Sequence, residues 1–139
     1  MITGIQMVYP YACKGYLYKN YYMKKIVFYS ADFTLSISLL MYLQSNYNIT
    51  TTSNIEDLKA ICSSFNCDLI IIDAEPSKKM EEICKDIKSI SPSIHIILVY
   101  VYDNKFKELE RNIKKYINTV FYKPFDLENV TQQLTALTS

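Results

Sequence analysis

The stretch FYKPFDLENV, residues 121–130, passes from an apolar run to the start of a helix within a few positions. Lys123 stands directly before Pro124, and a proline ends a strand there because it has no backbone N–H to donate. Asp126 supplies a carboxylate of the kind that caps the first turn of a helix. The stretch therefore predicts a strand that ends in a cation, and it raises the question of which anion Lys123 serves.

Length and composition limit the class of protein. The chain has 139 residues, half of them apolar, with a formal net charge of +1, which is enough for one domain with a hydrophobic core. This charge balance gives no reason to expect direct contact with nucleic acid or a membrane. No apolar run reaches the roughly 18 residues that a membrane span needs. The chain has only two glycines, which argues against a glycine-rich phosphate loop. We expect a cytoplasmic protein.

The cysteines and the histidine do not suggest a metal site. The four cysteines have no metal-binding spacing around the single histidine, His95. His95 lies inside an expected strand, which favours a buried or edge position over a role as ligand or base. We expect the cysteines to be reduced and mostly buried; they are Cys13, Cys62, Cys67 and Cys84.

Residues 1–23 differ from the rest of the chain. Their first 22 positions hold six tyrosines, two lysines and no acidic residue, and they lack the uninterrupted apolar centre of a secretory signal. We expect residues 1–23 to be a poorly ordered, tyrosine-rich extension. Residues 24–139 then form the domain.

From Lys24 onward, β-prone segments alternate with helical ones. The run DLIIID, residues 68–73, has four consecutive apolar residues, 69–72, as in parallel sheets that are covered on both faces. Ser53 and Glu56 suggest a capping box at one helix start. Five such βα units predict an α/β, doubly wound fold with one parallel sheet between two layers of helices. Strands are expected at 24–30, 48–52, 68–73, 93–100 and 118–122, and helices at 33–47, 53–65, 77–90, 104–117 and 126–137.

Three charged residues stand where the expected strands stop. Asp32 follows the first strand, Asp73 closes the third and Lys123 closes the fifth. In a doubly wound sheet these ends converge on one crevice, where two carboxylates and a lysine can hold Mg²⁺ and a phosphoryl group. Alternatively, Asp73 merely caps the helix near Ser77 and Lys123 is a solvated strand end. Spacing alone leaves both interpretations open.

Two motifs make a family resemblance specific. CDLIIIDAEP, residues 67–76, resembles the third strand of response-regulator receiver domains, the phosphoacceptor modules of two-component signalling, and YKPFDLENV, residues 122–130, resembles their fifth-strand signature. The resemblance covers essentially everything after Met23. It implies a flavodoxin-like (βα)5 three-layer sandwich with strand order 2-1-3-4-5, Asp73 as phosphoryl acceptor and Lys123 as phosphate-binding cation. It implies no enzyme activity beyond self-phosphorylation from a phosphohistidine or a small phosphodonor.

The metal site that the family uses is only partly retained. Receivers usually carry two adjacent acids after the first strand, and an ungapped alignment places Ser30 and Ala31 there. The leucine register of the first helix instead aligns Asp32 with the second acid. The resemblance therefore implies a weakened Mg²⁺ site made of Asp32, Asp73 and, from the following loop, Glu75.

The residues that couple phosphorylation to shape also differ. The family places a serine or threonine after the fourth strand, where this chain has Tyr100, Val101 and Tyr102. We expect Tyr100 to be too large for that role and to fill the crevice. Val120 replaces the aromatic residue that receivers use as a switch. Tyr100, Tyr102 and Val120 are candidates for an interaction or switch surface, although plain packing explains the tyrosines equally well.

Two functions are compatible with these features. The first is a stand-alone receiver-like protein of a phosphorelay, which accepts a phosphoryl group on Asp73 from a histidine kinase or phosphotransfer protein and signals through a downstream protein partner. The alternative is a pseudo-receiver, a protein-interaction module that acts without phosphorylation. A flavin-binding, flavodoxin-like function is disfavoured because no hydroxyl- and glycine-rich phosphate loop follows the first strand.

Overall fold

The sheet has the predicted topology. The structure is a computed structural model that describes residues 23–138, so the extension expected at residues 1–23 lies, apart from Met23, outside the described residues. All strand pairs are parallel, and the order is β2-β1-β3-β4-β5. The strands are β1 (Lys25–Ser30), β2 (Asn48–Thr52), β3 (Leu69–Asp73), β4 (His95–Tyr100) and β5 (Thr119–Tyr122).

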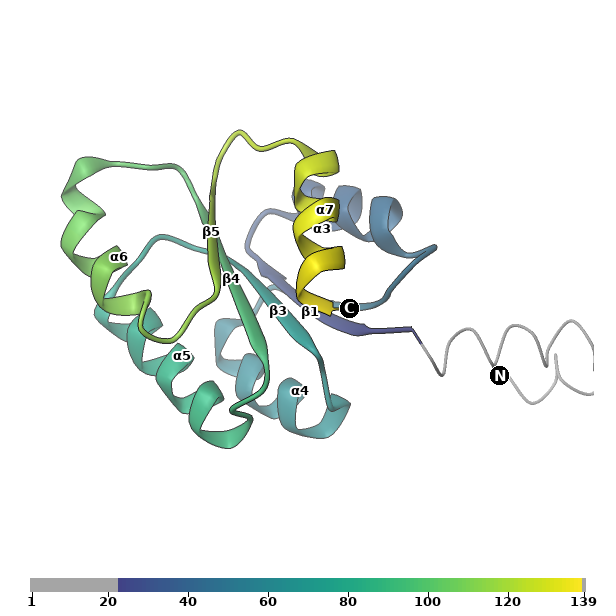
Figure 1. Cartoon of the computed structure of the whole chain (residues 1–139), viewed down its shortest axis with the longest axis horizontal. Coiled ribbons are helices and arrows are strands. Elements are labelled where there is room, and N and C mark those ends of the chain that lie inside the picture. The colour runs from purple at the N-terminus through teal and green to yellow at the C-terminus, as the bar shows by residue number, and fades with distance from the viewer. Residues whose placement is uncertain (1–22, 139) are drawn as a thin grey trace, which may run out of the picture.

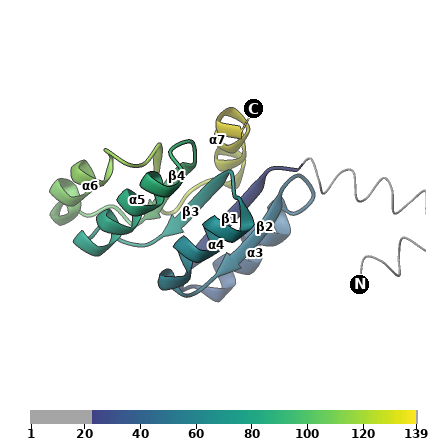
Figure 2. The same ribbon diagram turned by 90° about the horizontal axis from the view of Figure 1, so that it is seen from below.

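Helices cover both faces of this sheet. Figures 1 and 2 show α4, α5 and α6 on one face and α3 and α7 on the other, which is the expected three-layer sandwich. Between residues 23 and 138 no helix is both long and apolar enough to cross a bilayer. The helices are α3 (Phe33–Leu43), α4 (Leu58–Phe65), α5 (Lys78–Ile90), α6 (Lys107–Ile113) and α7 (Leu127–Thr138), with 3-10 turns η1 (Ile55–Asp57) and η2 (Asn104–Phe106).

Two hydrophobic cores lie on either side of the sheet. Along β3, Ile70 and Ile72 contribute to the core under α4, α5 and α6, while Leu69 and Ile71 contribute to the core under α3 and α7. Successive side chains of a strand point to opposite faces, so a strand buried on both faces must be apolar at every position. Burial of each such side chain contributes about 1.5–3 kcal/mol. This explains why the continuous apolar run predicted β3 correctly.

Several helix ends differ from the predictions. The capping box expected from Ser53 and Glu56 was wrong, because Asn54 accepts the hydrogen bond from the Glu56 N–H at 3.1 Å and starts η1. A side-chain oxygen that accepts from the N–H two residues later, as that of Asn54 does, favours a tight 3-10 turn before the α-helix begins. The helix expected at 33–47 ends at Leu43, and the one expected at 104–117 consists of η2 followed by α6 and ends at Ile113.

The end of α4 is formed by a left-handed residue. Asn66 has φ 54° and ψ 53° directly after the last residue of α4. Asparagine tolerates this conformation better than most residues with a side chain, and it is a common helix terminator there. It redirects the chain from α4 into β3 within two residues.

Candidate functional site

Asp73 and Lys123 meet at the carboxyl edge of the sheet. Lys123 Nζ lies 2.6 Å from Asp73 Oδ1, and the Asp73 side chain is only 8% exposed. The second oxygen, Asp73 Oδ2, accepts a hydrogen bond from Ser30 Oγ at 2.6 Å. Ser30 and Asp73 are register partners at the ends of β1 and β3. The structure thus brings together the predicted acid and cation, and it engages both oxygens of the carboxylate.

Asp73 is not the cap of α5. Ser77 accepts the hydrogen bond from the Met80 N–H at 3.0 Å and caps that helix. The Asp73 carboxylate is instead held by Lys123, and the loss of one partner from such a buried pair is costly because it leaves an uncompensated charge. The interpretation of Asp73 as a simple helix cap is therefore wrong.

Ser30 links the site to the start of α3. Its hydroxyl is buried, donates to Asp73 and accepts a hydrogen bond from the Asp32 N–H at 2.9 Å. The Asp32 side chain is exposed, and its Oδ1 accepts from the Leu35 N–H at 3.2 Å as the N-cap of α3. Sequence reasoning missed the role of Ser30, although the ungapped alignment placed it where receivers carry an acid.

The residues predicted for Mg²⁺ do not make a metal site in this arrangement. Within residues 23–138, no group of three His, Cys, Asp or Glu side chains lies close enough to hold a metal ion. A hard divalent cation needs several free oxygen ligands. Here Asp73 contacts Lys123 and Ser30, Asp32 caps α3, and Glu75 is exposed. These residues therefore do not fit the ion as they stand.

An apolar groove lies beside the ion pair, and Tyr100 does not fill it. The groove has a volume of about 490 Å³, and Val101 lines it together with Lys123 and Asp32. Tyr100 is 2% exposed and packs in the core under α4, α5 and α6. Side chains alternate along β4, so Tyr100 points away from the face on which Val99 lies. The expectation that Tyr100 occupies the crevice was wrong. The remaining lining residues are Leu35, Ser38, Pro124, Phe125 and Leu127.

Tyr100 instead belongs to a Tyr–Glu cluster, which consists of the buried Tyr100 and Glu110 and the more exposed Lys114 and Tyr122. The Tyr100 hydroxyl donates to Glu110 Oε1 at 2.5 Å, and the Tyr122 hydroxyl donates to Oε1 and Oε2 at 2.8 and 3.0 Å. Lys114 Nζ lies 3.2 Å from Oε2. The cluster joins α6 to the ends of β4 and β5.

The cluster perturbs the acidity of its members. Burial raises the pKa of Glu110, but the hydrogen bonds from Tyr100, Tyr122 and Lys114 outweigh it and lower the pKa below 4.5. Burial is the main cause, and the hydrogen bond to the Glu110 carboxylate the next, that raises the pKa of Tyr122 to about 12. The same two causes raise the pKa of Tyr100. Glu110 is thus a buried carboxylate that stays ionised because three donors hold it.

The predicted interaction surface is only partly exposed. Tyr102 is 46% exposed, and its ring packs edge-to-face on Tyr122 with centroids 5.2 Å apart. Val120 is partly buried against the core, and Tyr100 is inaccessible to a partner. Of the three candidates, only Tyr102 presents a large part of its side chain to solvent.

Several solved structures with the same architecture are response regulators or their receiver domains. The N-terminal domain of the nisin resistance regulator NsrR matches with a TM-score of 0.70 and 25% identity, over 82% of this chain and 97% of that one. The orphan response regulator HP1043 of H. pylori matches with a TM-score of 0.73 and 15% identity, over 84% of this chain and 97% of that one. This chain has a receiver-domain fold. A two-component response regulator from Clostridium difficile matches the same fold with a TM-score of 0.69 and 19% identity, over 82% of this chain and 94% of that one.

The sequence identity to these structures lies between 15% and 25%. No protein-family model matches the chain, and a comparison with curated proteins finds no match. Within the receiver fold, the strand ends carry Asp73 and Lys123 where the resemblance places the acceptor and the phosphate-binding cation. Their roles in phosphoryl chemistry remain predictions.

Proposed function

We propose that this protein is a receiver-like module that binds a protein partner without being phosphorylated. The observation that supports this most is the contact among Ser30, Asp73 and Lys123. Phosphoryl transfer to a carboxylate relies on a metal ion and a cation that neutralise charge on the transferring group. Here a hydroxyl takes the place of a metal-binding acid and occupies one oxygen of the acceptor, while Asp32 caps a helix.

The surroundings also favour a fixed shape. A phosphoryl group shifts an equilibrium only if it makes different contacts in two states. Val101 has no hydroxyl to bind a phosphoryl oxygen, and the aliphatic Val120 replaces the expected switch aromatic. Meanwhile Glu110 holds Tyr100 in the core. A surface that includes the exposed Tyr102 would then be presented constantly.

A second candidate function is the phosphoacceptor of a phosphorelay. Asp73 ends β3 within 2.6 Å of Lys123, which is the pair that phosphoryl transfer would use. In this case a histidine kinase or phosphotransfer protein donates the phosphoryl group to Asp73. Mg²⁺ would neutralise charge on that group if Asp32, Asp73 and Glu75 were free to bind the ion. Self-phosphorylation would be the chemistry of this site, and a downstream protein partner would receive the signal.

One experiment separates the two candidates. The full chain is incubated with acetyl phosphate and Mg²⁺, and its intact mass is compared with that of the Asp73→Asn variant, with folding checked by circular dichroism. We expect no phosphoryl adduct on either protein. An adduct on the wild type that is absent from Asp73→Asn would overturn the proposal in favour of the second candidate.

A gain-of-function variant tests whether Ser30, in place of an acid, is what weakens Mg²⁺ binding. Ser30→Asp restores an acid beside Asp73, and we expect it to bind Mg²⁺ more tightly than the wild type in a direct titration. Ser64→Asp adds the same charge on the exposed face of α4 and serves as the control. Equal Mg²⁺ affinity in the two variants would contradict the role assigned to Ser30.

A further inference from the structure

Two cysteines of the described chain, Cys62 and Cys67, lie next to each other. Cys62, on α4, is 6% exposed. A third cysteine, Cys84 on α5, is fully buried, so the prediction of core thiols is confirmed for Cys62 and Cys84. Cys67 lies just before β3 and is partly exposed, and all three are free thiols. Cys13 lies outside the described residues. The geometry at the end of α4 brings Cys62 and Cys67 into contact.

The left-handed Asn66 explains this contact. A left-handed residue after the last helical residue folds the chain back, so that the next residue packs on the helix residue one turn earlier. At the end of α4 those two positions are Cys67 and Cys62. Cys67 packs against the core cluster that contains Cys62, and the two thiols perturb each other's pKa. The pairing is therefore built into the helix terminus.

The two thiols are chemically unequal. The neighbouring Cys67 thiol, together with burial, raises the pKa of Cys62. The neighbouring Cys62 thiol lowers the pKa of Cys67, against the opposing effects of burial and Asp68. A thiolate is the reactive form of cysteine, and an oxidant must be able to reach it. Because Cys67 is partly exposed and Cys62 is buried, Cys67 is the nucleophile of the pair and Cys62 is the resolving thiol.

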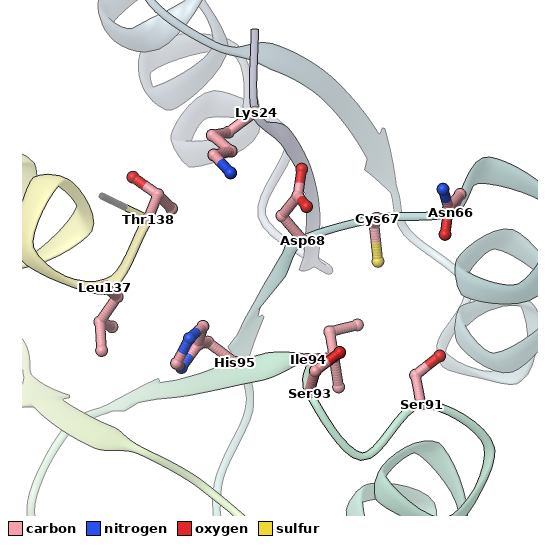
Figure 3. Close-up of a pocket in the computed structure, with 10 residues that line it drawn as sticks. All are labelled: Lys24, Asn66, Cys67, Asp68, Ser91, Ser93, Ile94, His95, Leu137 and Thr138. Atoms are coloured by element: carbon pink, nitrogen blue, oxygen red, sulfur yellow. The ribbon is translucent and has the colours of Figure 1, made fainter. Parts of the chain in front are cut away.

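Cys67 also has access to solvent. It lines a polar pocket of about 320 Å³ at the amino ends of the strands, together with Asp68, Ser93 and His95. Figure 3 shows the Cys67 sulfur in the wall of this pocket, near Ile94. The pocket is on the opposite end of β3 from Asp73, so it is separate from the site described above. A small polar oxidant can enter it from solvent.

We propose that Cys62 and Cys67 form a redox-active pair that hydrogen peroxide converts into a disulfide. The Cys67 thiolate attacks one peroxide oxygen, the O–O bond breaks, and the leaving hydroxide takes up a proton to give water and a sulfenic acid on Cys67. The Cys62 sulfur then attacks the Cys67 sulfur. The S–S bond forms, the S–O bond breaks, and the Cys62 proton leaves with the hydroxide as a second water. A thiol reductant such as glutathione reverses the step by exchange.

The test uses the full chain carrying Cys13→Ser, which removes the one cysteine outside the described residues. The protein is treated with hydrogen peroxide, its free thiols are alkylated, and its peptides are mapped by mass spectrometry. We expect a Cys62–Cys67 disulfide in monomeric protein that dithiothreitol reverses, with Cys84 still reduced. Absence of this disulfide at peroxide concentrations that fully oxidise free glutathione, or a disulfide to Cys84, would overturn the proposal.

Single substitutions test the assigned roles. In Cys62→Ser, dimedone should trap a sulfenic acid on Cys67, because no resolving thiol remains. In Cys67→Ser, Cys62 should stay reduced, because it is buried and its proton is held more tightly. Cys84→Ser is the matched control and should form the disulfide like the parent. Dimedone labelling of Cys62 in place of Cys67 would refute the order of the two steps.

Discussion

Replacing Tyr100 by phenylalanine tests the Tyr–Glu cluster. The change keeps the buried ring, which packs edge-to-face on Tyr122 and Phe106, and removes the hydroxyl that donates to Glu110 at 2.5 Å. A hydrogen bond to a charged group contributes about 1.5–3 kcal/mol, and Tyr100 is only 2% exposed, so water replaces its hydroxyl poorly. We therefore expect the free energy of unfolding to fall by about 2 kcal/mol.

The more exposed member of the cluster should matter less. Tyr122 is 41% exposed, so in Tyr122→Phe water can solvate the Glu110 oxygens that lose their donor. We expect a loss of about 1 kcal/mol. Tyr102→Phe is the matched control, because its hydroxyl donates only to the exposed Asn104 at 3.3 Å. Its stability should stay within about 0.5 kcal/mol of the wild type.

Urea denaturation followed by far-UV circular dichroism measures these differences, provided that the transitions are two-state and the m-value is unchanged. If Tyr100→Phe costs no more than Tyr102→Phe, the hydroxyl of Tyr100 does not stabilise the fold and the reasoning fails. The comparison is independent of the proposed function, because it concerns stability alone.

The same cluster predicts a pH dependence. The pKa of Glu110 in the folded protein is lower than its ordinary value of 4.5, because the hydrogen bonds of its three donors outweigh the effect of burial. The ionised carboxylate therefore contributes its full stability above pH 4.5, and this contribution is lost as the pH falls through the lower folded pKa. The penalty of Glu110→Gln should be largest at neutral pH and should shrink in acid. A penalty that is the same at both would contradict the assignment.

Substitutions at three further positions have expected outcomes in the same assay. Ser30→Ala should cost about 1–2 kcal/mol, because Asp73 loses a hydrogen bond; wild-type stability would exclude that contact. Asp32→Ala should cost about 1 kcal/mol as a lost N-cap, whereas Asp32→Ser should retain most of it; equal losses would argue against capping. Asn66→Gly should be close to neutral, whereas Asn66→Ala should cost about 1 kcal/mol at the left-handed position; equal stability of the two variants would contradict that backbone conformation.

The sheet could be predicted from the sequence because its central strands are buried on both faces. Continuous apolar runs such as residues 69–72 mark these strands directly, and every expected strand is present within two residues at either end. Helix ends were predicted less well. They depend on which polar side chain captures the first free N–H, and at η1 Asn54 does so rather than Ser53.

Only the site residues that directly end a strand could be predicted from the sequence. Asp73 and Lys123 were found because charged residues follow apolar runs at one edge of a parallel sheet. The contact of Ser30 with Asp73 depends on the register between β1 and β3, which cannot be read from the sequence. The direction of Tyr100 depends on the phase of alternation along β4, and a shift of one residue reverses the face of every side chain. Glu110 gave no signal, because a single acid on a charged helix resembles a solvated one.

Strand β3 carries a different reactive group at each end. Cys67 lies two residues before its first residue, and Asp73 is its last, so about 20 Å of buried strand separates them at 3.3 Å per residue. Groups this far apart, without shared partners, act additively to within about 0.5 kcal/mol. An oxidant that acts on Cys67 would therefore leave the Asp73–Lys123 pair unchanged, and a partner that covers one end of the strand leaves the other end accessible.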